Sequence, residues 1–187
     1  LSGYVEVDET YIGGEEEGVR GRQVKDKAIV IIALEMRSPK GFGRVRMKQI
    51  QDVSAESLTP FVCENVVTGT TVHTDGWKGY NQLGKAGYDR KITVLSKSED
   101  PAHVSMPGVH RLAALLDRWL LSTHQGAVSK KHLDYYLDEY TFRFNRRTSR
   151  SRGLLFYRLM QQAVMTYPTH YRDLIGGKQR QTAGTLS

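Results

Sequence analysis

Two aspartates stand where predicted strands of the chain could bring their carboxylates together. Asp8 lies inside residues 3–14, a stretch of good strand formers that ends at a glycine pair. Asp75 closes a second short strand, residues 70–75, and ligands of open α/β sheets collect at the carboxyl ends of strands. If the two strands are neighbours, both carboxylates can bind one cation, and such oxygen ligands suit Mg²⁺ or Mn²⁺.

Each aspartate also has an ordinary structural explanation. Strand alternation places Glu6, Asp8 and Thr10 on one face, so the first strand could be an edge strand with one solvated face. Asp75 and Gly76 form a dipeptide that is common in turns. Taken alone, the residues around either aspartate leave both explanations open.

The elements around these aspartates predict a mixed sheet. The apolar run at residues 28–34 is typical of a strand buried on both faces, and short links to its neighbours indicate an antiparallel meander. The predicted strands are residues 3–14, 28–34, 44–50, 70–75 and 91–95, with helices over residues 54–68 and 81–86. The resulting order, β-β-β-α-β-α-β, predicts an α/β fold with helices on both faces of the sheet.

The C-terminal half is predicted to be helical. An apolar stripe begins at Val109, a second helix follows with Ser129 as its cap, and a last helix spans about residues 154–165. We predict one domain over residues 1–175 and a polar, disordered tail over residues 176–187.

His110 and Asp117 occupy one face of the helix that begins at Val109. Residues seven apart on an α-helix differ by only about 20° in direction and lie roughly 10 Å apart along the axis. Their shared face points away from the stripe of Leu112 and Leu116, so both side chains could line a cleft. A histidine on a polar helix face is, by itself, more often a surface residue than a ligand.

The net charge of +7 and the pI near 9.5 favour a polyanionic partner, nucleic acid first. The single cysteine excludes an internal disulfide, and no apolar run approaches the length of a membrane span. We expect a cytoplasmic protein. A solvated face is the ordinary explanation for a basic run, but aromatic residues interleave the densest one. The candidate DNA-contacting residues are Arg20, Arg22, Lys25, Lys27, Lys78, Arg118, Arg143, Arg146, Arg147, Arg150 and Arg152.

Three separated motifs resemble those of one known family. They are residues 7–14 (VDETYIGG), residues 73–80 (HTDGWKGY) and a C-terminal pattern between residues 109 and 147. In this order they resemble the ISXO-like transposase domain, a DDE-type domain of bacterial insertion sequences. The resemblance covers about residues 3–165.

The resemblance implies a ribonuclease-H-like fold and a site that binds divalent metal, Mg²⁺ or Mn²⁺. Carried over to this sequence, the catalytic and metal-binding residues are Asp8, Asp75 and His110. The family's third position varies among Asn, Glu and His, and a Lys follows two helical turns later. Asp117 stands at that Lys position and reverses its charge. Our hypothesis is that this reversal weakens strand transfer.

The implied partner is DNA, both transposon ends and target, bound by a homo-oligomer associated with the nucleoid. Members of the family usually carry a zinc-ribbon element before this domain, and we expect end recognition to involve such residues. Two alternatives stay open. The chain could be a catalytically decayed DNA-binding remnant, or a nuclease of the same fold acting on RNA–DNA hybrids or Holliday junctions.

Overall fold

The computed structural model describes residues 1–13, 27–93, 106–125, 128–168 and 170–176. It divides into two compact units, the first ending at Asn145 and the second beginning at Arg146. The prediction of one domain over residues 1–175 stays a prediction, and most of the predicted tail lies outside the described residues. Each unit is described by itself.

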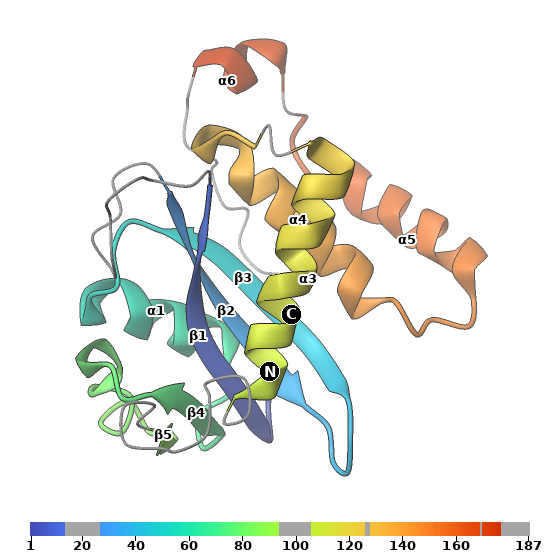
Figure 1. Cartoon of the computed structure of the whole chain (residues 1–187). Helices are drawn as coiled ribbons and strands as arrows, with labels where there is room; N and C mark the ends of the chain where they lie inside the picture. The colour runs from blue at the N-terminus through green and yellow to red at the C-terminus, as the bar shows by residue number, and fades with distance from the viewer. Residues whose placement is uncertain (14–26, 94–105, 126–127, 169, 177–187) are drawn as a thin grey trace. The chain divides into compact units, whose positions relative to one another are not determined.

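The described part of the first unit is built on a five-stranded mixed sheet of order β3-β2-β1-β4-β5 (Figure 1). The antiparallel meander of the first three strands and the two parallel pairings, β1 with β4 and β4 with β5, confirm the predicted α/β class. In this order β1, which carries Asp8, is central and lies next to β4, which carries Asp75. The strands are β1 (Tyr4–Ile12), β2 (Ala28–Met36), β3 (Phe42–Ile50), β4 (Thr71–Asp75) and β5 (Asp89–Thr93).

Helices cover both faces of this sheet. Residues Val30, Ile32 and Leu34 of β2 face α3 (Pro107–His124) and α4 (Leu133–Asn145). The alternate residues Ile31 and Ala33 face α1 (Ala55–Asn65) on the other side. Because both faces are packed, the strand needs apolar side chains at successive positions, which explains its continuous apolar run.

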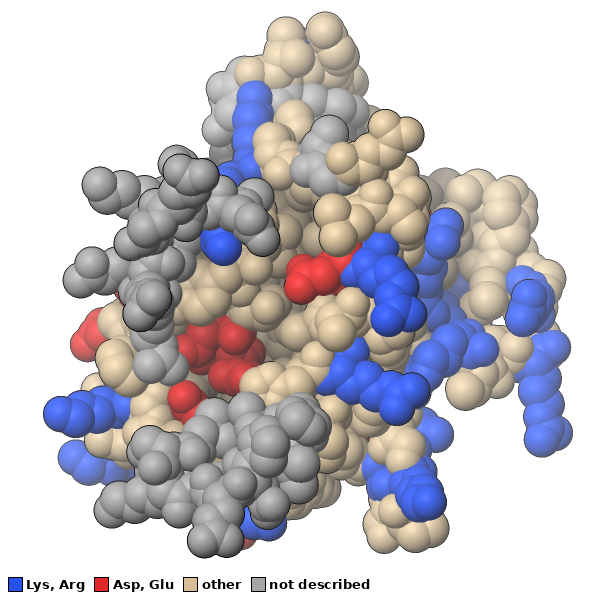
Figure 2. All heavy atoms as spheres, in the orientation of Figure 1, with Lys and Arg blue, Asp and Glu red and all other residues tan. Residues whose placement is uncertain are grey.

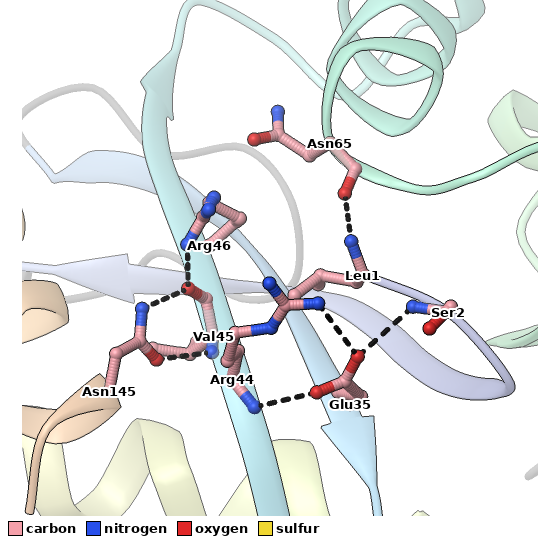
Figure 3. Close-up of polar contacts among 8 residues, drawn as sticks. All are labelled: Leu1, Ser2, Glu35, Arg44, Val45, Arg46, Asn65 and Asn145. Atoms are coloured by element: carbon pink, nitrogen blue, oxygen red, sulfur yellow. Dashed lines mark hydrogen bonds and ion pairs between the residues drawn. The ribbon is translucent and has the colours of Figure 1, made fainter. Parts of the chain in front are cut away.

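The C-terminal end of α4 is fixed to the outer strand of the sheet. The amide of Asn145 accepts the backbone N–H of Val45 at 2.7 Å and donates to the carbonyl of the same residue at 3.0 Å (Figure 3). Nearby, the carboxylate of Glu35 on β2 accepts backbone N–H groups of Ser2 and Arg44, both at 3.1 Å. These contacts join segments distant in the chain at the β3 side of the sheet.

The segment between β4 and β5 differs from its prediction. The helix expected over residues 81–86 is absent from this described segment. A short 3₁₀ helix, η1 (Lys78–Tyr80), precedes these residues, and turns continue from there through Gly87. Two glycines interrupt this segment, Gly84 and Gly87, and Gly87 has φ +89°, so a regular helix is disfavoured. The last strand also begins earlier than predicted, at Asp89.

The second unit contains α5 (Arg152–Val164) and α6 (Tyr171–Gly176). The helix predicted over about residues 154–165 is confirmed by α5, but α6 follows it, so it is not the last. None of the residues of α5 is buried. A short 3₁₀ helix, η3 (Lys130–His132), precedes α4 in the first unit. Within the described ranges, every helix is too short or too polar to cross a membrane.

Candidate active site

The sheet places Asp8 and Asp75 on adjacent parallel strands. Strand β1 pairs with β4 in parallel from Tyr4 with Thr71 to Glu6 with His73. Asp8 and Asp75 each lie two residues beyond the last pair of this register, Glu6 with His73, and Asp75 is the last residue of β4. Paired residues of parallel strands project from the same face, so the two carboxylates share a face and an edge.

That face is the one covered by α3, where His110 meets Asp8. Asp8 pairs with Ile32 of β2, whose side chain packs in the core beneath α3. The His110 Nδ1 atom lies 3.8 Å from the Asp8 Oδ2 atom, and the two side chains are 32% and 16% exposed. The structure therefore brings two of the three predicted catalytic residues together, partly open to solvent.

Tyr80 lies near three acidic residues, Glu9, Asp8 and Asp75. Its buried hydroxyl donates to the Glu9 carboxylate at 2.9 Å. Burial raises the pKa of Tyr80 well above its usual value, and the nearby charges of Glu9, Asp8 and Asp75 raise it further. One hydroxyl is thus within electrostatic reach of all three carboxylates. Figure 2 shows the largest group of acidic side chains left of the centre of this face, with smaller acidic patches elsewhere on it.

Asp75 also forms the turn that its sequence predicts. Its Oδ1 atom accepts the backbone N–H of Trp77 at 2.9 Å, which closes a side-chain turn. The indole of Trp77 donates to the carbonyl of Val53 at 2.7 Å. Asp75 is therefore both a turn residue and a candidate site residue, because the hydrogen bond that closes the turn also orients its carboxylate.

Glu6 determines where α3 begins. It is only 3% exposed, and its Oε2 atom accepts the backbone N–H of Val109 at 2.8 Å. The N–H of Gly108 also bonds to this carboxyl, and both bonds lower its pKa, but burial raises the pKa more strongly. A Cβ atom at Gly108 would lie 2.6 Å from Met36 Sδ and 2.8 Å from Glu6 Oε2, so a larger residue there would displace the ends of both side chains. Glu6 thereby holds His110 beside β1.

Asp117 lies further along α3 and is half-buried. Burial raises the pKa of its carboxyl above the usual value. Partial burial of a carboxylate is unfavourable unless a partner compensates it. The structure thus places a carboxylate, rather than a cation, in a partly desolvated position on this helix.

The candidate DNA-contacting residues occupy several places. In the first unit, Lys27 is half-buried, Lys78 and Arg118 are exposed, and Arg143 forms an ion pair with Glu139 at 3.1 Å. In the second unit, Arg146 is half-buried, whereas Arg147, Arg150 and Arg152 are exposed. Arg20, Arg22 and Lys25 lie outside the described residues.

The donor atoms at the site fit a hard divalent cation. Among the described residues, no group of three or more His, Cys, Asp or Glu side chains is arranged to hold a metal ion. The carboxylates of Asp8 and Asp75, however, are the oxygen donors that Mg²⁺ prefers. This ion is usually bound through one or two carboxylates, with water and substrate phosphate completing its shell.

The sequence match agrees with this geometry. A family model of the ISXO2-like transposase domain matches residues 1–145. The chain belongs to this family. The match ends at Asn145, where the first compact unit of this transposase-family chain also ends.

One solved structure similar to this chain is the catalytic core domain of BIV integrase. The two have a TM-score of 0.51 and 16% sequence identity, over 89% of this chain and 100% of that chain. The likeness confirms the predicted ribonuclease-H-like fold. A search of curated proteins found no match.

Three residues beyond the predicted set shape the site. In the sequence, Tyr80 stands out only as the last residue of the 73–80 motif, and Glu6 only as a residue on the same strand face as Asp8. Nothing in the sequence singles out Arg90. The acidic character of β1 was a signal for Glu6, because acidic residues in buried strands require partners. No local pattern distinguishes Arg90 from an exposed arginine on an outer strand.

Proposed function

We propose that the chain is the catalytic domain of a DNA transposase that cleaves phosphodiester bonds at insertion-sequence ends and joins them to target DNA. The observation that carries the proposal is the placement of Asp8 and Asp75 on adjacent strands, with His110 next to Asp8, in a transposase family. We further propose that it acts as a homo-oligomer on DNA at the nucleoid.

In this proposal Asp8 and Asp75 hold divalent metal, Mg²⁺ or Mn²⁺, and His110 is a neutral third ligand or orients water. Bound metal ions of this kind activate the attacking oxygen and stabilise the leaving oxygen. The side chains of the protein position the groups that would bind the metal. The Asp8 carboxylate lies 3.8 Å from the His110 Nδ1 atom, so its negative charge lies next to the ring. Glu6 fixes the helix that carries His110.

The charge distribution supports DNA as the partner. Residues 1–145 contain 19 Lys and Arg and 19 Asp and Glu, whereas residues 146–187 contain eight Lys and Arg and one Asp. The whole excess of positive charge therefore resides in the second unit. Seven of its eight basic residues are arginine, whose planar group binds phosphate through paired hydrogen bonds.

Within the second unit, basic side chains also lie close to one another. Burial lowers the pKa of Arg146, and the charge of Arg158 lowers it further. Like charges held together are relieved by a polyanion. We propose that Arg147, Arg150 and Arg152, which are exposed, supply phosphate contacts together with this pair.

The test is metal-dependent cleavage of duplex DNA carrying the inverted repeats that flank the gene. We expect nicking and joining with Mg²⁺ or Mn²⁺, reduced to background in Asp8→Asn and Asp75→Asn. The matched control is Asp89→Asn, which removes an exposed carboxylate from the same sheet. An equal loss in the control, or full activity in both site variants, would contradict the assignment.

Two other results would identify the alternatives. If the wild-type protein binds DNA but does not cleave it, the result would favour the catalytically decayed remnant. The motivation for this alternative is the half-buried Asp117 at the family's Lys position. Cleavage of RNA–DNA hybrids without joining would favour a nuclease of the same fold.

A further inference from the structure

Arg90 binds the segment that carries Asp75 with every nitrogen of its side chain. The Nε atom donates to Thr74 Oγ1 at 3.0 Å, and Nη1 donates to Asn81 Oδ1 at 2.7 Å. The Nη2 atom donates to two backbone carbonyls, those of Asp75 and Trp77, both at 3.1 Å. A single guanidinium therefore spans the chain from the end of β4 to the turn after η1.

The guanidinium approaches Asp75 from behind its carboxylate. Arg90 pairs with Val72 in the β4–β5 register, and Val72 belongs to the core beneath α1. Strand alternation places Thr74 on this same face and Asp75 on the opposite one, toward α3. Arg90 thus holds the backbone of Asp75 without occupying the space in front of its carboxylate.

The same side chain connects Asp75 to β1. The guanidinium carbon lies 5.9 Å from the centre of the Tyr80 ring, and the Tyr80 hydroxyl donates to Glu9, the neighbour of Asp8. The Trp77 residue whose carbonyl Arg90 binds also donates its N–H to the Asp75 carboxylate. Both acidic strands are therefore linked to one arginine.

Only arginine supplies this set of contacts. Burial lowers the pKa of Arg90 while the charge of Asp75 raises it, and a guanidinium stays charged in proteins. A lysine would keep the charge but present one nitrogen instead of a planar fork of three. Charge and geometry can therefore be separated by substitution.

We propose that Arg90 is a positioning residue that fixes the Asp75 carboxylate in the orientation required for divalent metal binding. The inference rests on the proposed function. Arg90 acts through Asp75 and touches neither substrate nor metal.

The test compares Arg90→Lys with Arg37→Lys, the same substitution at an exposed residue of the β2–β3 connection. Mn²⁺ binding to the DNA-free protein is measured by electron paramagnetic resonance, and hydrogen exchange is measured over residues 71–81. We expect Arg90→Lys to weaken Mn²⁺ binding about 10- to 100-fold, the usual effect of losing support behind a metal ligand. Exchange over residues 74–81 should accelerate, and Arg37→Lys should match the wild type in both.

A second variant covers the case in which Arg90→Lys fails to fold. Asn81→Ala removes one exposed partner of the guanidinium and should weaken Mn²⁺ binding in the same direction by a smaller factor. If Arg90→Lys folds and binds Mn²⁺ with wild-type affinity, the inference is overturned. If Arg90→Lys does not fold, wild-type Mn²⁺ affinity in Asn81→Ala overturns it instead. In either case, cleavage of DNA by the wild-type protein still upholds the proposed function. A wild-type protein that neither binds Mn²⁺ nor cleaves DNA would overturn both.

Discussion

Replacing Glu6 tests whether α3 is held to the sheet by hydrogen bonds or by charge. Glu6→Ala removes the acceptor for the N–H groups of Val109 and Gly108. Each buried donor left without an acceptor costs about 1–3 kcal/mol. Water entering the vacated space offsets part of this, so we expect a loss of about 2–4 kcal/mol, which for a chain of this size lowers Tm by about 4–16 °C.

Glu6→Gln should behave differently because its side-chain oxygen still accepts these bonds. At neutral pH we expect its stability to lie within about 1 kcal/mol of the wild type. Thermal unfolding of the metal-free protein, followed by circular dichroism, measures both variants. A loss in Glu6→Gln as large as that in Glu6→Ala would refute the reasoning, because it would show that the negative charge is what holds the helix.

The pH dependence gives an independent check. Burial raises the pKa of Glu6 despite the two hydrogen bonds that lower it. A carboxyl with a raised folded-state pKa contributes stability that is complete below its unfolded pKa of about 4.3 and is lost as pH rises through the folded pKa. The stability of the wild type relative to Glu6→Gln should therefore decrease from about pH 4 towards neutrality. An increase over that range would contradict the burial of this group.

Three further predictions concern other parts of the chain. Asp117→Lys should strengthen binding to transposon ends and raise strand transfer; no gain in either would end the hypothesis that this aspartate impairs the protein. Gly108→Ala should cost about 1–3 kcal/mol in thermal unfolding, because the new Cβ would lie 2.8 Å from Glu6 Oε2; an unchanged Tm would show that the helix start can shift freely. Each of Arg147→Gln and Arg150→Gln should reduce the slope of log Kd for duplex DNA against log salt by about 0.9; unchanged slopes would remove these residues from the DNA contact.

The meander of the first three strands was predictable because it depends on local patterns. The continuous apolar run of β2 identified a strand packed on both faces, and the first three strands with short links formed the expected meander. The sequence left open whether the strands of Asp8 and Asp75 are neighbours, and the structure shows that β4 pairs with β1. The approach of His110 to Asp8 required the family resemblance, because helix periodicity alone fixes a face and not its partner.

The parts that sequence could not supply depend on contacts between distant residues. Glu6 accepts its hydrogen bond from Val109, 103 residues away, so nothing near Glu6 indicates its partner. Arg90 is 15 residues from Asp75 and reaches it because β5 pairs with β4. The acidic character of β1 indicated that Glu6 needs a partner but not which residue it is, whereas Arg90 was locally indistinguishable from a solvated arginine.

The attachment of α4 to β3 has a consequence for the state of the protein in solution. An outer strand presents unpaired backbone groups, and these can pair with a strand of another molecule. Asp134 at the beginning of α4 accepts the N–H of Gln49 at 3.2 Å, and Asn145 at its end satisfies both backbone groups of Val45. The helix therefore blocks this edge at two positions through side chains alone. Substituting Asn145 would leave both backbone groups of Val45 open to a strand of another molecule, so we expect the residue that ends the first unit to limit association through this edge.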